Sequence, residues 1–233
     1  MTIIDKASPN FDSRDGHAID MLVLHYTGMK SAANALDRLC DPTAKVSAHY
    51  AIDEDGKIYQ LVAEENRAWH AGVSFWRGHT NINQRSIGIE LVNPGHDYGY
   101  RAFPQAQMVS LAELCKDILS RHAIPARNVV GHSDIAPERK EDPGELFDWQ
   151  WLAHEGVGFW PVNPAERKAL AQDLTGSCAS LSLAQDLSEY GYDTTNLPKT
   201  ILAFQRRWRP KLLTGLWDRE CALILNSLLN ARL

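Results

Sequence analysis

Two histidines and one aspartate occupy positions from which they could bind a metal ion together. His25 ends one apolar run, His132 ends another, and Asp142 lies in the loop Pro137–Gly144. Two imidazoles and one carboxylate form the ligand set of many catalytic zinc sites, which leave the fourth position to water. Each residue also has an ordinary explanation, because a histidine at a strand end is usually packed and Asp before Pro-Gly usually serves a turn.

A single carboxylate interrupts the apolar segment Ser86–Val92. Alternate residues of a strand face opposite sides, so the large apolar side chains share one face (Ile87, Ile89, Leu91) and Glu90 lies on the other. Burying a carboxylate is costly unless it has a partner or a chemical role. Glu90 is therefore either an acid–base group or one half of a buried salt bridge with Lys140 or an arginine.

Strands and helices are expected to alternate along the first 160 residues. The pattern predicts strands at 21–26, 49–53, 57–62, 86–92 and 128–131, and helices at 32–39 and 104–122. An Asp-Gly turn at 55–56 predicts that the second and third strands form a β-hairpin. Residues 63–85 are predicted to form a long loop, and long loops in compact domains are often functional.

The C-terminal part of the chain has a different pattern. Pro161 and Pro164 indicate a linker over residues 161–176. Apolar residues at helical spacing around Leu187, Phe204 and Leu228 predict three short helices in residues 177–233. We therefore expect two domains, 1–160 and 177–233.

Composition excludes several classes of protein. The 233 residues are 44% hydrophobic, enough for one main core and a second small one, and the formal net charge of −5 argues against a nucleic-acid partner. No stretch approaches the ~18 apolar residues of a membrane span. The N-terminus lacks a leader pattern and the four cysteines are far apart, so we expect a cytoplasmic monomer, or a periplasmic one if a leader was removed.

Five motifs occur in order along the first domain. They are Leu24-His-Tyr-Thr27, Ser47-Ala-His-Tyr50, Trp69-His-Ala-Gly72, Ser86-Ile-Gly-Ile-Glu-Leu91 and the segment from Gly131 to Gly144. Together they resemble the motif set of the type-2 N-acetylmuramoyl-L-alanine amidases, the AmpD- and AmiD-like bacterial enzymes that are related to peptidoglycan recognition proteins. The resemblance covers roughly residues 18–160. It implies an α/β fold with a mixed central β-sheet flanked by helices.

The resemblance also implies roles for individual residues. It matches His25, His132 and Asp142 to the ligands of one Zn²⁺ per chain. Glu90 matches the general base, and Lys140 matches a lysine near the reacting carbonyl group. These roles agree with the chemistry of zinc hydrolases, in which a base takes a proton from water and a cation stabilises the oxyanion.

Three further residues are predicted to contact substrate. The resemblance suggests that His70 lines a sugar–peptide groove. Asn81 and Arg85 precede the strand of Glu90 and could meet polar or carboxylate groups of the substrate. A solvated loop face explains Asn81 and Arg85 nearly as well.

The implied activity is zinc-dependent hydrolysis of the amide bond between N-acetylmuramic acid, or its anhydro form, and L-alanine. The substrates would be peptidoglycan or muropeptides in cell-wall turnover and recycling. The alternative is a non-catalytic peptidoglycan-binding protein on the same scaffold, a class that typically lacks a zinc ligand. A structural zinc domain is disfavoured because the cysteines have no ligand spacing. Only the resemblance argues against an amidohydrolase with another substrate.

The C-terminal segment has a resemblance of its own. Gly191-Tyr192 followed by Thr200–Gln205 is similar to the three-helix peptidoglycan-binding domain of cell-wall hydrolases. This similarity implies a small three-helix C-terminal domain and suggests that it binds glycan. The stretch Arg206-Arg-Trp-Arg-Pro210 departs from that pattern.

Overall fold

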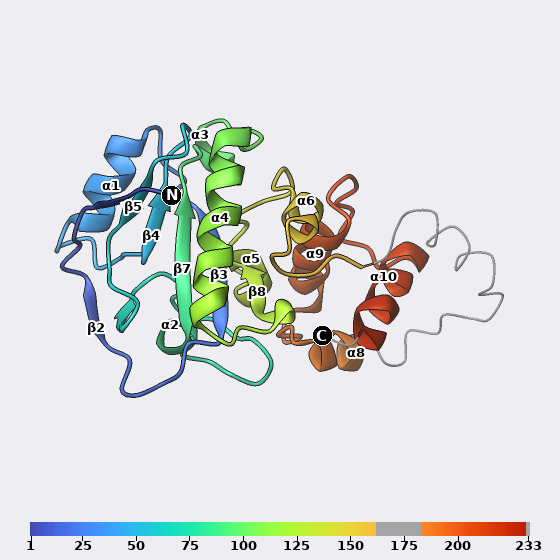
Figure 1. Ribbon diagram of the computed structural model, residues 1–233. Helices are drawn as coiled ribbons and strands as arrows, with labels where there is room; N and C mark the ends of the chain where they lie inside the picture. The colour runs from blue at the N-terminus through green and yellow to red at the C-terminus, as the bar shows by residue number, and fades with distance from the viewer. Residues whose placement is uncertain (162–182, 232–233) are drawn as a thin grey trace.

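Two neighbouring parallel strands of six residues each are the longest strands of a six-stranded mixed sheet in the computed structural model, which describes residues 1–161 and 183–231 (Figure 1). The strand order is β1 (Ile3–Asp5), β5 (Ile58–Gln60), β4 (Tyr50–Ile52), β7 (Ser86–Leu91), β3 (Met21–Tyr26) and β8 (Val129–Gly131). Strands β4, β7, β3 and β8 are parallel to one another, while β5 is antiparallel to β4 and parallel to β1. Strands β2 (Phe11–Ser13) and β6 (Asn66–Ala68) form a separate antiparallel pair.

A long helix covers one face of this sheet. Helix α4 (Gln105–Arg121) lies across β7 and β3 in Figure 1 and buries Leu111, Leu114 and Ile118 against them. Helix α1 (Ala32–Cys40) packs Leu36 and Leu39 near the β4–β5 hairpin. The remaining helices of this part are short: α2 (Ile82–Arg85), α3 (Gly95–Tyr98), η1 (Ala126–Asn128), α5 (His132–Ile135) and α6 (Trp149–His154).

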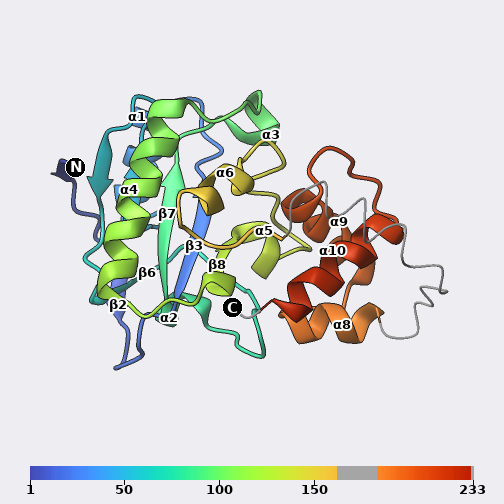
Figure 2. The same ribbon diagram turned by 45° about the vertical axis from the view of Figure 1, so that its right-hand side comes forward.

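The C-terminal helices pack beside α5 and share a core with the sheet. They are α8 (Leu183–Tyr190), α9 (Leu197–Trp208) and α10 (Arg219–Asn230), and Figure 2 shows α9 next to α5. One hydrophobic cluster joins Val23 and Val130 of the sheet to Phe204, Trp208 and Leu225 of these helices. The tail is therefore fastened to the first part of the chain through common buried surface.

The predicted mixed α/β fold and the helical C-terminal region are confirmed. The predicted hairpin is the β4–β5 pair, and the predicted helices at 32–39 and 104–122 agree with α1 and α4 to within one residue at each end. The expected loop 63–85 also contains β6 and α2. The predicted linker lies outside the described residues apart from position 161, and so does the start of the C-terminal segment.

Strand alternation sets the direction of the two central polar side chains. Leu22 and Leu24 of β3 and Ile89 of β7 belong to the cluster under α4. His25 follows Leu24, Glu90 follows Ile89, and the two are paired in the parallel register. Because side chains alternate along a strand, both point to the opposite side of the sheet.

On that opposite side, the space beside Gly88 is filled by an imidazole from a loop. A Cβ atom on Gly88 would lie 2.4 Å from Cγ of His70. A glycine inside a strand weakens it unless another group approaches closely, and here the ring of His70 does so. The missing side chain of Gly88 thus lets the loop around His70 lie directly on the sheet.

We expect Gly88→Ala to destabilise the protein by about 1–3 kcal/mol, because the added methyl group overpacks the contact with His70. In a His70→Ala background the same substitution should cost much less, since the imidazole is gone. Urea unfolding of the four metal-free proteins measures this coupling. Equal penalties in both backgrounds would contradict the packing explanation.

Candidate metal centre

Three potential ligand atoms meet at the carboxyl ends of the central strands. Nδ1 of His25 lies 2.9 Å from Nδ1 of His132, and Oδ2 of Asp142 lies 3.1 Å from each of these nitrogens. All three residues are buried and form the one His/Cys/Asp/Glu group in the described residues with this mutual geometry. The predicted ligand residues, which are up to 117 positions apart in the sequence, are therefore brought together.

The outer nitrogens of both histidines are held by hydrogen bonds. With Nδ1 turned to the cluster, Nε2 of His132 donates to the carbonyl oxygen of Ala71 at 3.1 Å. Nε2 of His25 donates to Nδ1 of His70 at 3.1 Å, and Nε2 of His70 in turn donates to Oγ of Ser86 at 3.2 Å. Such bonds fix the ring orientation and leave the inner nitrogen lone pairs free for a metal.

Burial and neighbouring charge favour the ligand forms of these groups. Burial, and then the charge of His132, lower the pKa of His25 to about 4, so its ring is neutral at pH 7. Burial would raise the pKa of Asp142, but the charge and hydrogen bonds of His132 and His25 bring it well below its usual range. A metal binds neutral imidazole and ionised carboxylate, and these are the forms favoured at His25 and Asp142.

The donor set fits a zinc ion. Zinc with bonds of roughly 2.0–2.1 Å in a tetrahedron has ligand atoms roughly 3.3 Å apart, close to the 2.9–3.1 Å separations seen here. Two nitrogens and one carboxylate oxygen match its preferences, and three protein ligands leave a position open. A cavity of about 380 Å³ borders His132 and Asp142 and gives that open position access to a substrate.

Glu90 lines the same cavity and has a buried oxygen without a partner. Its Oε2 atom is buried and accepts no hydrogen bond from the described residues. Burial, and then the charge of Asp142, raise the pKa of Glu90 well above its usual value, although Lys140 opposes this. The described residues show no ion pair between Glu90 and Lys140 or an arginine, so the salt-bridge interpretation finds no support.

Lys140 and His70 also line this cavity, so the structure brings them together with Glu90 and two of the ligands. Lys140 lies two residues before Asp142, on the loop that follows α5. Arg139 of this loop donates to the carbonyl oxygens of Ala71 and Val73 and so ties it to the loop of His70.

The structure does not bring Asn81 and Arg85 to this cavity. Arg85 precedes the first residue of β7, whereas Glu90 lies near its other end, roughly 16 Å away at 3.3 Å per residue. The guanidinium group of Arg85 forms an ion pair with the carboxylate of Asp20, with Nε 2.7 Å from Oδ1. Both Asn81 and Arg85 line a separate hollow with His17 and His79.

Several supporting groups carry no signal of their own in the sequence. Oδ1 of Asn83 accepts hydrogen bonds from the backbone N–H groups of His70 and Ala71, at 3.1 and 2.8 Å, and so fixes the loop behind the ligands. The carbonyl oxygen of Ala71 could not be found from residue types. Gly88 is the exception, because an isolated glycine inside a strand indicates that another group packs closely against the backbone there.

The site is a buried group of two histidines and one carboxylate that could hold a metal ion. It borders a cavity that also contains Glu90, which is the arrangement that metal-assisted hydrolysis requires. The family model for N-acetylmuramoyl-L-alanine amidase matches residues 15–145 of this chain. The chain therefore belongs to the N-acetylmuramoyl-L-alanine amidase family.

Individual relatives agree with this assignment. The chain is 41% identical over 230 residues to N-acetylmuramoyl-L-alanine amidase AmiD of Escherichia coli K12, which covers 91% of this chain and 82% of the relative. It is 39% identical over 160 residues to 1,6-anhydro-N-acetylmuramyl-L-alanine amidase AmpD of Citrobacter freundii, which covers 61% and 83%.

Solved structures give the same result over nearly the whole chain. The complex of AmiD from E. coli with anhydro-N-acetylmuramic acid-L-Ala-D-γ-Glu-L-Lys superposes with a TM-score of 0.81 at 36% identity and covers 94% of this chain and 97% of the other. AmpDh3 from Pseudomonas aeruginosa superposes with a TM-score of 0.79 at 35% identity and covers 95% and 93%. This chain is an amidase of the same family.

The raised pKa of Glu90 predicts how the stability of a Glu90→Gln variant depends on pH. A carboxyl group whose pKa is raised by folding stabilises the protein fully below its unfolded pKa of about 4.5, and this contribution is lost as pH rises through the folded pKa. Glutamine does not ionise. In the metal-free state the variant should therefore gain melting temperature relative to the unmodified protein at pH 8, and this gain should shrink towards pH 4.

Thermal melting at both pH values, with chelator present, measures this difference. Glu113→Gln is the matched control, because Glu113 is an exposed residue of α4 and should change stability by less than about 0.5 kcal/mol at either pH. An advantage of Glu90→Gln that is as large at pH 4 as at pH 8 would show that ionisation of Glu90 does not destabilise the fold.

Proposed function

We propose that this amidase uses one zinc ion, held by His25, His132 and Asp142, to hydrolyse the amide bond between N-acetylmuramic acid and L-alanine in muropeptides. The observation that carries this proposal is the triangle of three ligand atoms, 2.9–3.1 Å apart, beside a cavity that also contains Glu90. Two related structures hold an anhydromuramic acid peptide, which supports an anhydro-muropeptide as the substrate of this chain as well.

Glu90 is proposed as the group that moves protons. A zinc ion bound at this site would lower the pKa of water towards ~7 and polarise the carbonyl oxygen of the scissile amide. Glu90 then accepts a proton from the attacking water and returns it to the departing nitrogen of L-alanine. Its unpartnered, buried oxygen has no competing hydrogen bond from the described residues to give up before it does so.

Lys140 and His70 have separate proposed roles. The ammonium group of Lys140 stabilises the negative oxygen that develops on the carbonyl group when the amide is attacked. His70 accepts the hydrogen bond of His25 and forms part of the cavity wall. It therefore acts mainly by orienting a ligand and only borders the substrate.

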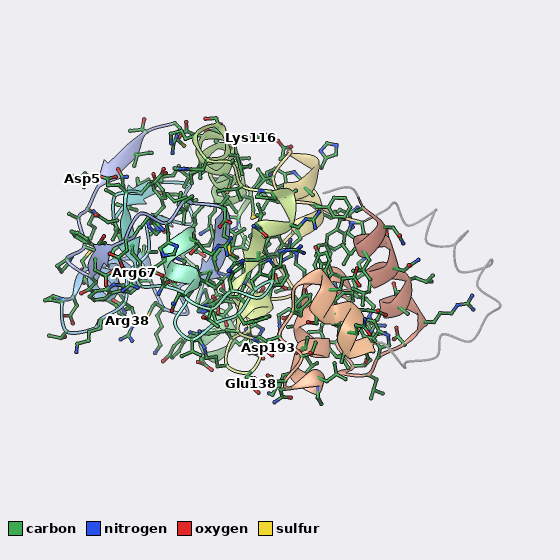
Figure 3. The ribbon with its side chains drawn as sticks, turned by 90° about the horizontal axis from the view of Figure 1, so that it is seen from below. Asp5, Arg38, Arg67, Lys116, Glu138 and Asp193 are labelled. Carbon is green, nitrogen blue, oxygen red and sulfur yellow. The ribbon has the colours of Figure 1, made fainter. Side chains whose placement is uncertain are left out.

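The wider cavity suits a substrate that carries carboxylates. Arg38 of α1, labelled in Figure 3 on the side of the molecule away from the tail, lines the cavity together with Lys140 and Arg139. Arginine and lysine bind the carboxylates of a peptide stem through charge-assisted hydrogen bonds. Asn81 and Arg85 are not part of this proposal.

A purely peptidoglycan-binding role explains the site less well. A binding protein has no need for three converging ligand atoms, nor for a carboxylate with a buried oxygen that has no hydrogen-bond partner among the described residues. Among the described helices none is long and apolar enough to cross a membrane. The cytoplasmic compartment and the monomeric state stay predictions of the sequence.

We expect the purified protein to bind one zinc ion per chain. Replacing any one ligand, as in His132→Ala, should remove most of the metal and the activity, because two protein ligands hold zinc far more weakly than three. Elemental analysis after dialysis measures this. His154→Ala is the control, since that side chain is exposed and should keep a full complement of zinc. A His132→Ala protein with full zinc would exclude the site.

Variants at the two proposed catalytic residues, Glu90 and Lys140, should lose turnover without losing the metal. With anhydro-N-acetylmuramic acid-L-Ala-D-γ-Glu-L-Lys as substrate, Glu90→Gln should lower kcat by roughly 10²–10⁴-fold, because glutamine cannot accept a proton. Lys140→Met should lower it by roughly 10²–10³-fold through loss of oxyanion stabilisation. Zinc content is measured on the same samples. Near-normal turnover in Glu90→Gln would exclude Glu90 as the base.

A further inference from the structure

Three buried arginines lie at the end of helix α9, in the stretch that departs from the peptidoglycan-binding pattern. The residues Arg206, Arg207 and Arg209 are each less than 9% exposed. A guanidinium group withdrawn from water is costly unless anionic or carbonyl partners meet it. The identity of those partners shows what each arginine holds.

Arg207 binds the segment that carries the ligand His132. Its NH2 group donates to the carbonyl oxygen of Val129 at 3.0 Å, and its NH1 group lies 3.4 Å from Oδ2 of Asp134. The guanidinium plane also lies over the ring of Trp149, 3.3 Å from the ring centre. Arg207 thus contacts residues on either side of His132 in the sequence, Val129 in β8 and Asp134 in α5.

Asp134 connects the tail to the backbone next to His132. Its Oδ2 atom accepts the N–H group of Gly131 at 2.7 Å, and its Oδ1 atom accepts the hydroxyl group of Tyr192 at 2.8 Å. Nε1 of Trp208 donates to the same hydroxyl oxygen at 3.1 Å. Two tail residues, Arg207 and Tyr192, therefore meet at one carboxylate two positions from the proposed ligand His132, and Trp208 holds the hydroxyl group of Tyr192 in place.

Arg206 binds the segment that carries the ligand Asp142. Its NH2 group donates to Oε1 of Glu141 at 3.1 Å, and its Nε atom lies 3.6 Å from Oε2 of Glu145. These two glutamates enclose the turn that begins with Asp142. In Figure 3, Glu138 of the same loop lies on the side where the tail, marked by Asp193, meets the rest of the molecule.

We propose that helix α9 is a structural part of the metal centre, in which Arg207 positions the segment of His132 and Arg206 positions the segment of Asp142. The inference rests on the proposed zinc site. Consecutive residues of a helix point about 100° apart, which lets one turn of α9 reach two separate segments. The tail then has a function without any glycan contact, because it keeps two ligands at the separation that a zinc ion needs.

Arg209 provides a control on the same helix end. Its guanidinium group pairs with Asp218 and lies 3.7 Å from a carboxylate oxygen of Glu220, both of which belong to the tail. Substitution of Arg209 should disturb the tail itself without touching the segments that carry the ligands. It separates a general loss of tail stability from loss of positioning.

The experiment compares the unmodified full chain with Arg206→Gln, Arg207→Lys, Arg209→Gln and Arg209→Lys. Lysine in place of Arg207 keeps the charge but cannot bond Val129 and Asp134 together while it lies on Trp149. Zn²⁺ affinity is measured by chelator competition, and visible spectra of the Co²⁺-substituted proteins report the ligand geometry. Thermal melting of the metal-free proteins confirms that each variant folds.

Outer groups that orient metal ligands typically contribute 10–100-fold to metal affinity. We expect Arg206→Gln and Arg207→Lys to weaken zinc binding about tenfold and to shift the Co²⁺ bands, while both Arg209 variants stay within about twofold. Unchanged affinity in both the Arg206 and Arg207 variants would overturn the proposal, and so would an equal loss in the Arg209 variants. An unmodified chain that binds no zinc would overturn the proposed function together with this inference.

Discussion

The structure depends on keeping three polar ligand atoms about 3 Å apart in a buried place. Without a cation between them, two buried imidazoles and a carboxylate form only a few hydrogen bonds with one another, and these replace the stronger hydration that the groups have in water. The surrounding chain must therefore hold them. Parallel pairing of β3 with β7 and β8 fixes the backbone beneath His25 and His132, and outer hydrogen bonds to His70 and Ala71 fix the two rings.

Asp142 is held differently, because it belongs to a loop. Neither a strand nor a long helix carries it. The backbone N–H of Ser133 in α5 donates to its carbonyl oxygen at 2.9 Å, and further contacts hold the loop on either side. Arg139 ties one part of this loop to the carbonyl oxygens of residues 71 and 73, and Arg206 ties another part to the tail. One arginine of the loop itself and one from the tail thus supply part of the order that regular secondary structure gives to His25 and His132.

Patterns along one element were enough to predict much of this site. Alternation along β7 placed Glu90 opposite Ile89, and the ligand types at strand ends suggested a metal. Contacts between distant segments could not be predicted in this way. Asn81 and Arg85 are close to Glu90 in sequence, but an extended strand carries Arg85 to the other end of the sheet. The helical spacing of apolar residues predicted the helices of the tail, but it could not predict that Arg207 contacts Asp134.

The glycine in β7 has a consequence for how the cavity admits a large substrate. Because the ring of His70 occupies the place of a side chain on Gly88, lifting the loop around it would remove the packing on this part of the strand, which costs free energy. Arg139 fastens this loop from the other direction. Trp69 and His70 therefore form a rigid wall of the cavity. If the cavity widens for a bulky glycan, the movement has to come from the other lining segments, such as the turn at Gly28.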